Sequence, residues 1–365
     1  MAFIRQRSAK DGGGWQVRYA GPDGREHSRT FRRSADAHRF ASVIEADLIR
    51  GQWIDPQLGQ TTFDNFQAQW RVIHLDRLKP TTRSGYLSLL RAHLIPVFGP
   101  MPLQAIRRHD VESFVTGRLS NGLSASRIGQ AYRLLSMILS SAVDNDYLTK
   151  NPAASVRLPR TPKREQHFLS ASEVSRLVDA AQPEHRTLVL VLAFCGLRWG
   201  EAVALRWRRV NGSKLDIRES ASEADGKLWF GPTKTYESRS VPLPGFLVDA
   251  LAHHPNRRPS GLVFTSSRGG PLRGNNWRRR VWHPALERAE LPPIRIHDLR
   301  HTCAALLISA GHSAKAIQQH LGHSSITVTM DTYGHLFPEE QDRISASLDA
   351  LWGGVPSAGP SDRRA

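Results

Sequence analysis

The sequence predicts a multidomain protein of the α+β class, mainly α-helical with small β-sheets. Its length of 365 residues exceeds what one hydrophobic core ordinarily organises, which favours two or three domains. Strand-like alternation of apolar and polar residues is confined to 1–60 and to a stretch near 214–243, whereas the spacing elsewhere is helical. We expect domains at 1–60, 61–153 and 168–352, with a linker at 154–167.

The N-terminal domain is predicted to be a three-stranded sheet with one helix. Apolar residues alternate with polar ones over 15–20, which indicates a strand. Gly-Pro-Asp-Gly at 21–24 is a strong turn signal, and a second strand is expected at 25–31. Ser34 is expected to cap the helix that follows.

The second region is predicted to be all-helical. Phe63, Phe66 and Trp70 recur at spacings of three and four, as one face of a helix does. Capping residues and prolines predict the other boundaries. Helices are expected to begin at Thr81, His109 and Ser124, and the helix from Thr81 is expected to be broken by the Pro- and Gly-containing stretch 96–100.

The linker and the tail differ from the domains in composition. The linker contains prolines and basic residues without periodicity, so we expect it to be stiff and solvated. The third domain begins with a helix that Ser170 or Ser172 can cap. Residues 353–365 are rich in Gly, Pro and Ser and are predicted to be a disordered tail.

The chain is strongly basic, with a formal net charge of +17. Such a charge favours a polyanionic partner, because Lys and Arg contacts to phosphate supply most non-specific affinity for nucleic acid. The alternative is a merely basic soluble protein. Arginine is abundant throughout, and its planar guanidinium suits bidentate phosphate contacts, which favours the first interpretation.

Cysteine usage and hydropathy exclude several classes of protein. Cys195 and Cys303 both lie in apolar helical patterns and are expected to be buried thiols. No C-x-x-C pair is present, which argues against a thiolate zinc site. The N-terminus lacks the apolar core of a signal peptide, and no apolar run approaches a membrane span. We expect a cytoplasmic protein with no membrane partner.

One ordered set of residues carries the chemistry. Arg198 follows an apolar helical run and precedes Glu201, which can pair with its guanidinium. Further on come His-Asp-Leu-Arg at 297–300, Leu-Gly-His at 321–323 and a lone Tyr333. Two arginines, two histidines and a tyrosine can hold a phosphodiester and attack it without a metal ion.

At these spacings the set resembles the active site of tyrosine recombinases, the phage integrase family, and the resemblance covers most of the chain. It implies that Tyr333 is the nucleophile. Arg198 and Arg300 would bind the non-bridging oxygens of the scissile phosphate. His297 would take the tyrosine proton, and His323 would hydrogen-bond the phosphate or the nucleophile.

The resemblance also assigns a proton donor for the leaving oxygen. Lys234 lies in a Thr-Lys-Thr turn ahead of Ser-x-Arg-x-Val-Pro-Leu, where the family has a lysine that protonates the departing 5′ oxygen. Lys227 is the competing candidate. Tyr147 and Tyr236 are alternative tyrosines, but neither follows a Leu-Gly-His. The family chemistry requires no cofactor, neither metal nor ATP.

The other domains also resemble parts of these enzymes. The first resembles the arm-binding domain of phage-lambda-type integrases, although a dimerisation or capping module would look similar. The second resembles the core-binding domain, and the linker would let the two larger domains close on DNA. The basic residues expected to contact DNA are Arg18, Arg29, Arg83, Arg91, Arg127, Arg133, Arg157, Arg160, Lys163 and Arg164.

A zinc site is the competing interpretation of the histidines in this region. His297 and His301 have the i, i+4 spacing of zinc proteases. The segment lacks the glutamate of H-E-x-x-H, and Arg300 between the histidines would repel a cation. We therefore predict no metal.

The sequence thus predicts a site-specific recombinase that integrates or excises a phage or other mobile element through a 3′-phosphotyrosine. Expected partners are double-stranded DNA at attachment sites, a homotetramer on that DNA, and a directionality factor or host DNA-bending protein. A resolvase or inversion recombinase and a catalytically silent DNA-binding regulator remain alternatives. The apolar stripe of a helix predicted at 338–352 packs either on its own domain or on a neighbouring protomer.

Overall fold

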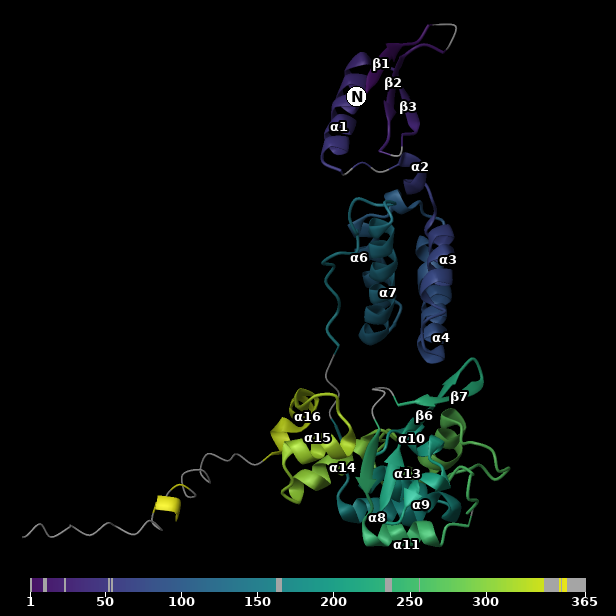
Figure 1. Ribbon diagram of the computed structural model, residues 1–365, viewed down its shortest axis with the longest axis vertical. Coiled ribbons are helices and arrows are strands. Elements are labelled where there is room, and N and C mark those ends of the chain that lie inside the picture. The colour runs from purple at the N-terminus through teal and green to yellow at the C-terminus, as the bar shows by residue number, and fades with distance from the viewer. Residues whose placement is uncertain are drawn as a thin grey trace, which may run out of the picture. The chain divides into compact units, whose positions relative to one another are not determined.

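The computed structural model describes residues 2–8, 12–22, 24–51, 53, 55–161, 166–233, 238–255, 257–337, 348 and 350–352. The chain separates into two compact units, Met1–Lys163 and Arg164–Ala365. Figure 1 shows the helices and strands of each unit.

The start of the first unit is an antiparallel sheet of strands β1 (Phe3–Gln6), β2 (Trp15–Ala20) and β3 (Glu26–Phe31), in the order β1-β2-β3. Helix α1 (Ser34–Ile49) covers one face of this sheet (Figure 1). The predicted alternation explains the packing, because Val17 and Tyr19 point to the covered face and are buried against α1. The expectation of three strands and one helix is thus met.

The expected cap of α1 was wrong. Ser34 is the first helical residue, and Arg33 takes the extended N-cap conformation without a side-chain hydrogen bond. The hydroxyl of Ser34 lies 3.3 Å from Nδ1 of His38, one turn into the helix. A residue whose own backbone is helical cannot hold the extended conformation that a cap requires.

The rest of the first unit is a helical bundle with a separate core, as the spacing of apolar residues predicts. Thr62 and Ser124 cap two of its long helices through their hydroxyls. The elements are α2 (Pro56–Gly59), α3 (Phe63–His74), α4 (Pro80–Leu89), the π-helix η2 (Leu90–Leu94), α5 (Ile95–Phe98), η3 (Leu103–Ala105), α6 (Arg108–Ser120) and α7 (Ala125–Asp144).

The predicted break at 96–100 begins later than expected. The chain stays helical from α4 through η2 and α5, so that Pro96 lies inside the helical path. The wider π turn before Pro96 shifts the hydrogen-bond register, and the missing proline N–H then falls in the first turn of α5, where no donor is needed. The helical path ends at Gly99.

The second unit has one large core and a smaller one, which includes Cys303, Leu321 and Tyr333. Ser170, the first of the two predicted caps, receives the backbone N–H of Glu173. The elements are α8 (Ala171–Ala180), α9 (Pro183–Phe194), α10 (Trp199–Ala204), η4 (Trp207–Arg209), β4 (Val210–Asn211), β5 (Lys214–Ile217), β6 (Glu219–Ala224), β7 (Lys227–Pro232), β8 (Arg239–Pro242), α11 (Gly245–Ala252), α12 (Gly274–Trp277), the π-helix η5 (Arg278–Trp282), α13 (His283–Arg288), α14 (Asp298–Ser309), α15 (Ala314–Leu321), α16 (Ile326–Tyr333) and η6 (Gly334–Leu336).

Two small antiparallel sheets lie in this unit. One has the order β4-β5-β8, and the other is the hairpin β6-β7, which projects from the unit (Figure 1). Asp225 and Gly226 turn the hairpin with φ of 50° and 71°, as the Asp-Gly signal predicts. Strand β8 pairs with β5, and its first residue, Arg239, lies opposite Ile217.

Two helices of this unit begin beside the residues singled out in the sequence. α10 begins at Trp199, because the carboxylate of Glu201 accepts the backbone N–H of Arg198 and so fixes Arg198 as the cap. α14 begins at Asp298, whose carboxylate accepts the backbone N–H of Arg295. Both chemically important segments therefore lie at helix N-termini.

The C-terminal predictions fall largely outside the described residues. This holds for the tail at 353–365 and for most of the helix predicted at 338–352. Within that helix, Leu348, Leu351 and Trp352 are exposed. None of the helices in the described part of the chain is long and apolar enough to cross a membrane.

Candidate active site

Arg198 is mounted at the turn between α9 and α10. Its Nη1 donates to Glu201 Oε1 at 2.7 Å, and its Nη2 donates to the carbonyl of Gly322 at 3.1 Å. The predicted pairing with Glu201 is present. The side chain remains 27% exposed, so it is held in one orientation and is still open to solvent.

A second arginine shares the same carboxylate. Arg239 donates through Nη2 and Nη1 to the two oxygens of Glu201 at 2.7 and 3.1 Å, and through Nε to the carbonyl of His320. Glu201 is only 1% exposed. Burial alone would raise its pKa, but the hydrogen bonds and charges of Arg239 and Arg198 lower the pKa of Glu201 to about 2. The carboxylate is therefore ionised at neutral pH.

Arg239 was not predicted as a site residue. Its only sequence signal is its place in the Ser-x-Arg-x-Val-Pro-Leu segment, the same segment that supports Lys234. Arg239 belongs to the site because its guanidinium binds Glu201, the carboxylate that also holds Arg198, and the carbonyl of His320.

Arg300 is buried and bridges two turns. Its Nη1 and Nη2 donate to the carbonyls of Gly196 and Leu321, both at 2.6 Å. Burial, followed by repulsion from Arg198 and Arg239, lowers the pKa of Arg300 to about 9. The guanidinium therefore remains charged at neutral pH.

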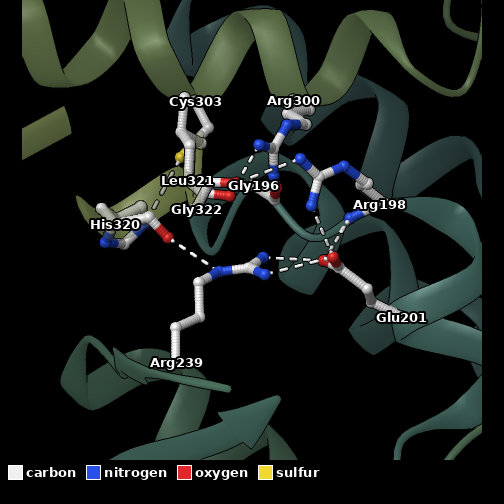
Figure 2. Close-up of polar contacts among 9 residues, drawn as sticks. All are labelled: Gly196, Arg198, Glu201, Arg239, Arg300, Cys303, His320, Leu321 and Gly322. Carbon is white, nitrogen blue, oxygen red and sulfur yellow. Dashed lines mark hydrogen bonds and ion pairs between the residues drawn. The ribbon is translucent and has the colours of Figure 1, made fainter. Parts of the chain in front are cut away.

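The guanidinium groups of Arg198, Arg239 and Arg300 converge from three separate segments (Figure 2). In Figure 2 the carboxylate of Glu201 lies among these guanidinium groups and pairs with Arg198 and Arg239. The cluster thus keeps an excess of positive charge in a partly buried place. Such a place favours a phosphate group, since guanidinium forks match phosphate oxygens.

Tyr333 lies at the end of α16 with its side chain 1% exposed. Its Oη is 2.8 Å from Nδ1 of His301, and its ring stacks on that of His323 with centroids 6.3 Å apart. Burial raises the pKa of Tyr333 to about 12, although the charge of Arg300 acts in the opposite direction. The phenol is therefore protonated at neutral pH and needs a base to attack.

His297 and His323 are both neutral at pH 7. Burial, together with the charges of nearby arginines and of His301, lowers the pKa of each to about 4. Nδ1 of His323 lies 2.9 Å from Oγ1 of Thr329. The ring of His297 packs edge-on against that of His301.

Two family models match the chain. Residues 167–340 match the family described as "Phage integrase family". Residues 62–117 match "Phage integrase, N-terminal SAM-like domain". The chain belongs to the phage integrase family. This integrase is a site-specific recombinase, as its sequence predicts.

Two relatives of this chain are named integrases. The ICEBs1 integrase of Bacillus subtilis (strain 168) is 28% identical over 291 residues, which span 75% of this chain and 78% of the relative. The putative prophage phiRv2 integrase of Mycobacterium tuberculosis (strain CDC 1551 / Oshkosh) is 27% identical over 357 residues, which span 93% of each protein.

Solved structures share the fold of this integrase. A Tn1549 transposon integrase in complex with a circular intermediate DNA aligns with a TM-score of 0.69 at 19% identity, over 80% of this chain and 99% of that one. A lambda integrase tetramer bound to a Holliday junction aligns with a TM-score of 0.63 at 20% identity, over 90% of this chain and 94% of that one.

Several predicted site residues of the integrase lie outside the described residues. These are Lys234, Lys163, Arg164 and the alternative tyrosine Tyr236. The other alternative, Tyr147, packs its ring on Phe66 in the helical core, 4.8 Å between centroids. That position is in the first unit, whereas the arginine cluster is in the second.

The remaining DNA-contact candidates are spread over the first unit of the integrase and the start of the linker. Arg18 pairs with Glu26, Arg83 pairs with Asp76, and Arg127 donates to Ser88 and Gln130. The guanidinium of Arg29 lies over the rings of Phe31 and Phe40. The candidates that are exposed to solvent are Arg18, Arg29, Arg83, Arg91, Arg133, Arg157 and Arg160.

The metal and thiol predictions can be compared with the described residues. No group of three or more His, Cys, Asp or Glu side chains is arranged to hold a metal ion in this part of the integrase. Cys195 and Cys303 are free and buried, as expected, and burial raises the pKa of both thiols.

Proposed function

We propose that the integrase cuts and rejoins double-stranded DNA through a 3′-phosphotyrosyl link to Tyr333. The observation that carries the proposal is that Arg198 and Arg300 donate to two adjacent carbonyls, those of Gly322 and Leu321. The short turn 323–325 joins these two residues to α16, the helix that ends in Tyr333.

The guanidiniums would bind the non-bridging oxygens of the scissile phosphate. Their charge stabilises the additional negative charge of the transition state, a task that bound metal ions perform in many other phosphoryl transfers. Because Arg198 and Arg300 are already held by Glu201 and by backbone carbonyls, little reorganisation is needed when the phosphate arrives.

In the proposed reaction, the bond from Tyr333 Oη to phosphorus forms as the bond from phosphorus to the 5′ oxygen breaks. The tyrosine proton passes to a base, and the leaving 5′ oxygen receives a proton from an acid, for which we propose Lys234 on the strength of its sequence context. Rejoining reverses both transfers when a 5′ hydroxyl attacks the phosphotyrosine.

We further propose that the substrates are attachment sites of a mobile element. The relatives named above are integrases of an integrative element and of a prophage, and one of them aligns over 93% of this chain, including most of the N-terminal domain. That domain favours an integrase over a resolvase. The face of its sheet opposite α1, which carries Arg18, is the proposed arm-DNA surface.

A homotetramer on DNA is the proposed assembly, as in the lambda integrase tetramer bound to a Holliday junction. The exposed C-terminal residues Leu348, Leu351 and Trp352 would dock on a neighbouring protomer. The proposed acceptor is an apolar groove of about 560 Å³ on the second unit, lined mainly by Phe194, Pro242, Leu243, Pro244, Leu307, Ala316 and Ile317. A truncation after Phe337 that leaves the oligomer on DNA unchanged would contradict this docking.

The deciding experiment uses the full chain and a nicked duplex that spans the element's attachment junction, in EDTA. Wild-type protein should form an SDS-resistant protein–DNA band, and Tyr333→Phe should bind the same duplex without forming one. A band from Tyr333→Phe would remove Tyr333 as nucleophile. Binding without any wild-type band would favour a DNA-binding regulator.

A further inference from the structure

The hydroxyl of Tyr333 makes a hydrogen bond that the family assignment does not use. Nδ1 of His301, in the first turn of α14, lies 2.8 Å from Oη of Tyr333 at the end of α16. The two rings meet at an angle of 60° with centroids 5.7 Å apart. This contact joins the segment that carries Arg300 to the segment that carries the nucleophile.

The direction of this hydrogen bond follows from the ionisation of its partners. Tyr333 is protonated at neutral pH, because its pKa is raised. Burial lowers the pKa of His301, with Arg295 and Arg300 adding to that effect and Asp298 opposing it. A neutral imidazole has one acceptor nitrogen, and we assign Nδ1 as that acceptor, with the ring proton on Nε2. The phenol therefore donates to His301.

The other histidines near Tyr333 are placed less well to take its proton. The ring of His323 lies nearly parallel to that of Tyr333, with an interplanar angle of 13°, and its Nδ1 is engaged by Thr329. The ring of His297 packs edge-on against His301 at 5.0 Å. Within the described residues, the side-chain hydrogen bond of the Tyr333 hydroxyl is the one to His301.

We propose that His301 is the general base that accepts the proton of Tyr333 during DNA cleavage. This inference rests on the proposed function of Tyr333 as nucleophile. It assigns to His301 the task that the resemblance gave to His297, and it makes His297 a neighbour that positions His301.

The proposed step balances. As the bond from Oη to phosphorus forms and the bond from phosphorus to the 5′ oxygen breaks, the Oη proton moves to Nδ1 of His301. His301 becomes an imidazolium, and the proposed acid protonates the 5′ oxygen. In rejoining, the imidazolium returns its proton to the departing phenolate, so the enzyme ends in its starting state.

The charged groups around His301 suit a base that is neutral at rest and positively charged only during the reaction. His297, Asp298 and Arg300 face it from its own helix, Arg295 from the turn before, and Tyr333 and His323 from the segment packed against it. Burial, with the charges of Arg295 and Arg300 adding to it, lowers the pKa of His301 and keeps the resting imidazole neutral. The carboxylate of Asp298, held by Arg295, stabilises the imidazolium once it has formed.

The test compares single-turnover cleavage rates of the full-length protein on the nicked attachment-site duplex in EDTA. In His301→Asn, the side-chain oxygen can take the place of Nδ1 and accept the same hydrogen bond, but it cannot take up a proton. We expect unchanged DNA affinity and about 10²- to 10⁴-fold slower formation of the covalent adduct. His297→Asn is tested in parallel, and His253→Asn, at an exposed end of α11, is the matched control that should cleave normally.

The decisive readout replaces Tyr333 with a fluorinated tyrosine of lower phenol pKa in each background. A more acidic phenol has less need of a base, so the defect of His301→Asn should shrink while that of His297→Asn should not. An undiminished His301→Asn defect, or a rescue confined to His297→Asn, would overturn the proposal. Thermal melting of each variant reports folding separately, and adduct formation by Tyr333→Phe would instead refute the proposed function.

Discussion

Arg239 places both terminal nitrogens of its guanidinium on the carboxylate of Glu201, at 2.7 and 3.1 Å. The same carboxylate accepts Nη1 and the backbone N–H of Arg198. One buried acid therefore fixes two arginines that come from different segments (Figure 2). Because Arg239 also reaches the carbonyl of His320, the network ties the α9–α10 turn to the end of α15.

Glu201→Gln is expected to destabilise the fold by about 3–5 kcal/mol, since removal of one partner leaves buried guanidinium charge uncompensated. Cleavage should fall as well, because Arg198 loses its support. Urea unfolding and the single-turnover assay measure the two effects. Glu112→Gln is the matched control: its pair with Arg108 is about half exposed, so the loss should be about 0–1 kcal/mol. Equal losses in the two variants would contradict the role of burial.

Stability is expected to fall between pH 6.5 and 4. The pKa of His297 and of His323 is lowered to about 4 by burial and by nearby cations, whereas an unfolded histidine titrates near 6.5. In this window the unfolded chain binds more protons than the native one, so protonation favours unfolding as the pH falls. Glu201 keeps its charge throughout this range, because its pKa is about 2.

Urea denaturation at a series of pH values measures this slope. His297→Asn and His323→Asn should each flatten it, since neither asparagine titrates. His253→Asn, at an exposed position, should leave the slope as in the wild type. A wild-type free energy of unfolding that stays constant from pH 7 to pH 4 would contradict the neutral state assigned to His297 and His323.

The sequence predicts those parts of the structure that local chemistry determines. The caps at Ser124 and Ser170 and the Asp225–Gly226 hairpin follow from rules that act over a few residues. The place of Arg198 in a turn follows from the apolar run before it and from Gly196.

Contacts over long sequence distances could not be predicted in this way. Arg239 joins the site only because β8 pairs with β5, which brings it to Glu201 and to the carbonyl of His320. The sequence shows the spacing of His301 from His297, but only the tertiary structure places its ring at the hydroxyl of Tyr333. A motif therefore identifies the reacting groups, and tertiary packing decides which neighbour serves each one.

Arg198→Ala is expected to lower the cleavage rate by about 10²- to 10³-fold while most DNA affinity is retained, because its guanidinium acts on charge that develops in the transition state. The ratio of cleavage rate to binding constant separates the two effects. Arg208→Ala, an exposed arginine that pairs with Glu219, is the control that should leave cleavage near wild type. If affinity falls as much as cleavage, Arg198 positions DNA and does not serve the chemical step.

Gly196→Ala should harm both stability and cleavage. Gly196 has φ of +60°, and a Cβ there would lie 2.5 Å from Leu321 Cδ2 and 3.1 Å from Cys303 Sγ. Strain and overlap together should cost about 1–3 kcal/mol. Since the carbonyl of Gly196 holds Arg300, any shift of this turn also moves that guanidinium.

Gly85→Ala is the matched control, because Gly85 lies inside α4 and a Cβ there would meet open space. This change should stabilise the protein by up to about 1 kcal/mol. The expected changes in the free energy of unfolding have opposite signs in the two variants, and cleavage should be lost only in Gly196→Ala. A Gly196→Ala protein that unfolds and cleaves like wild type would show that the turn does not hold Arg300 in place.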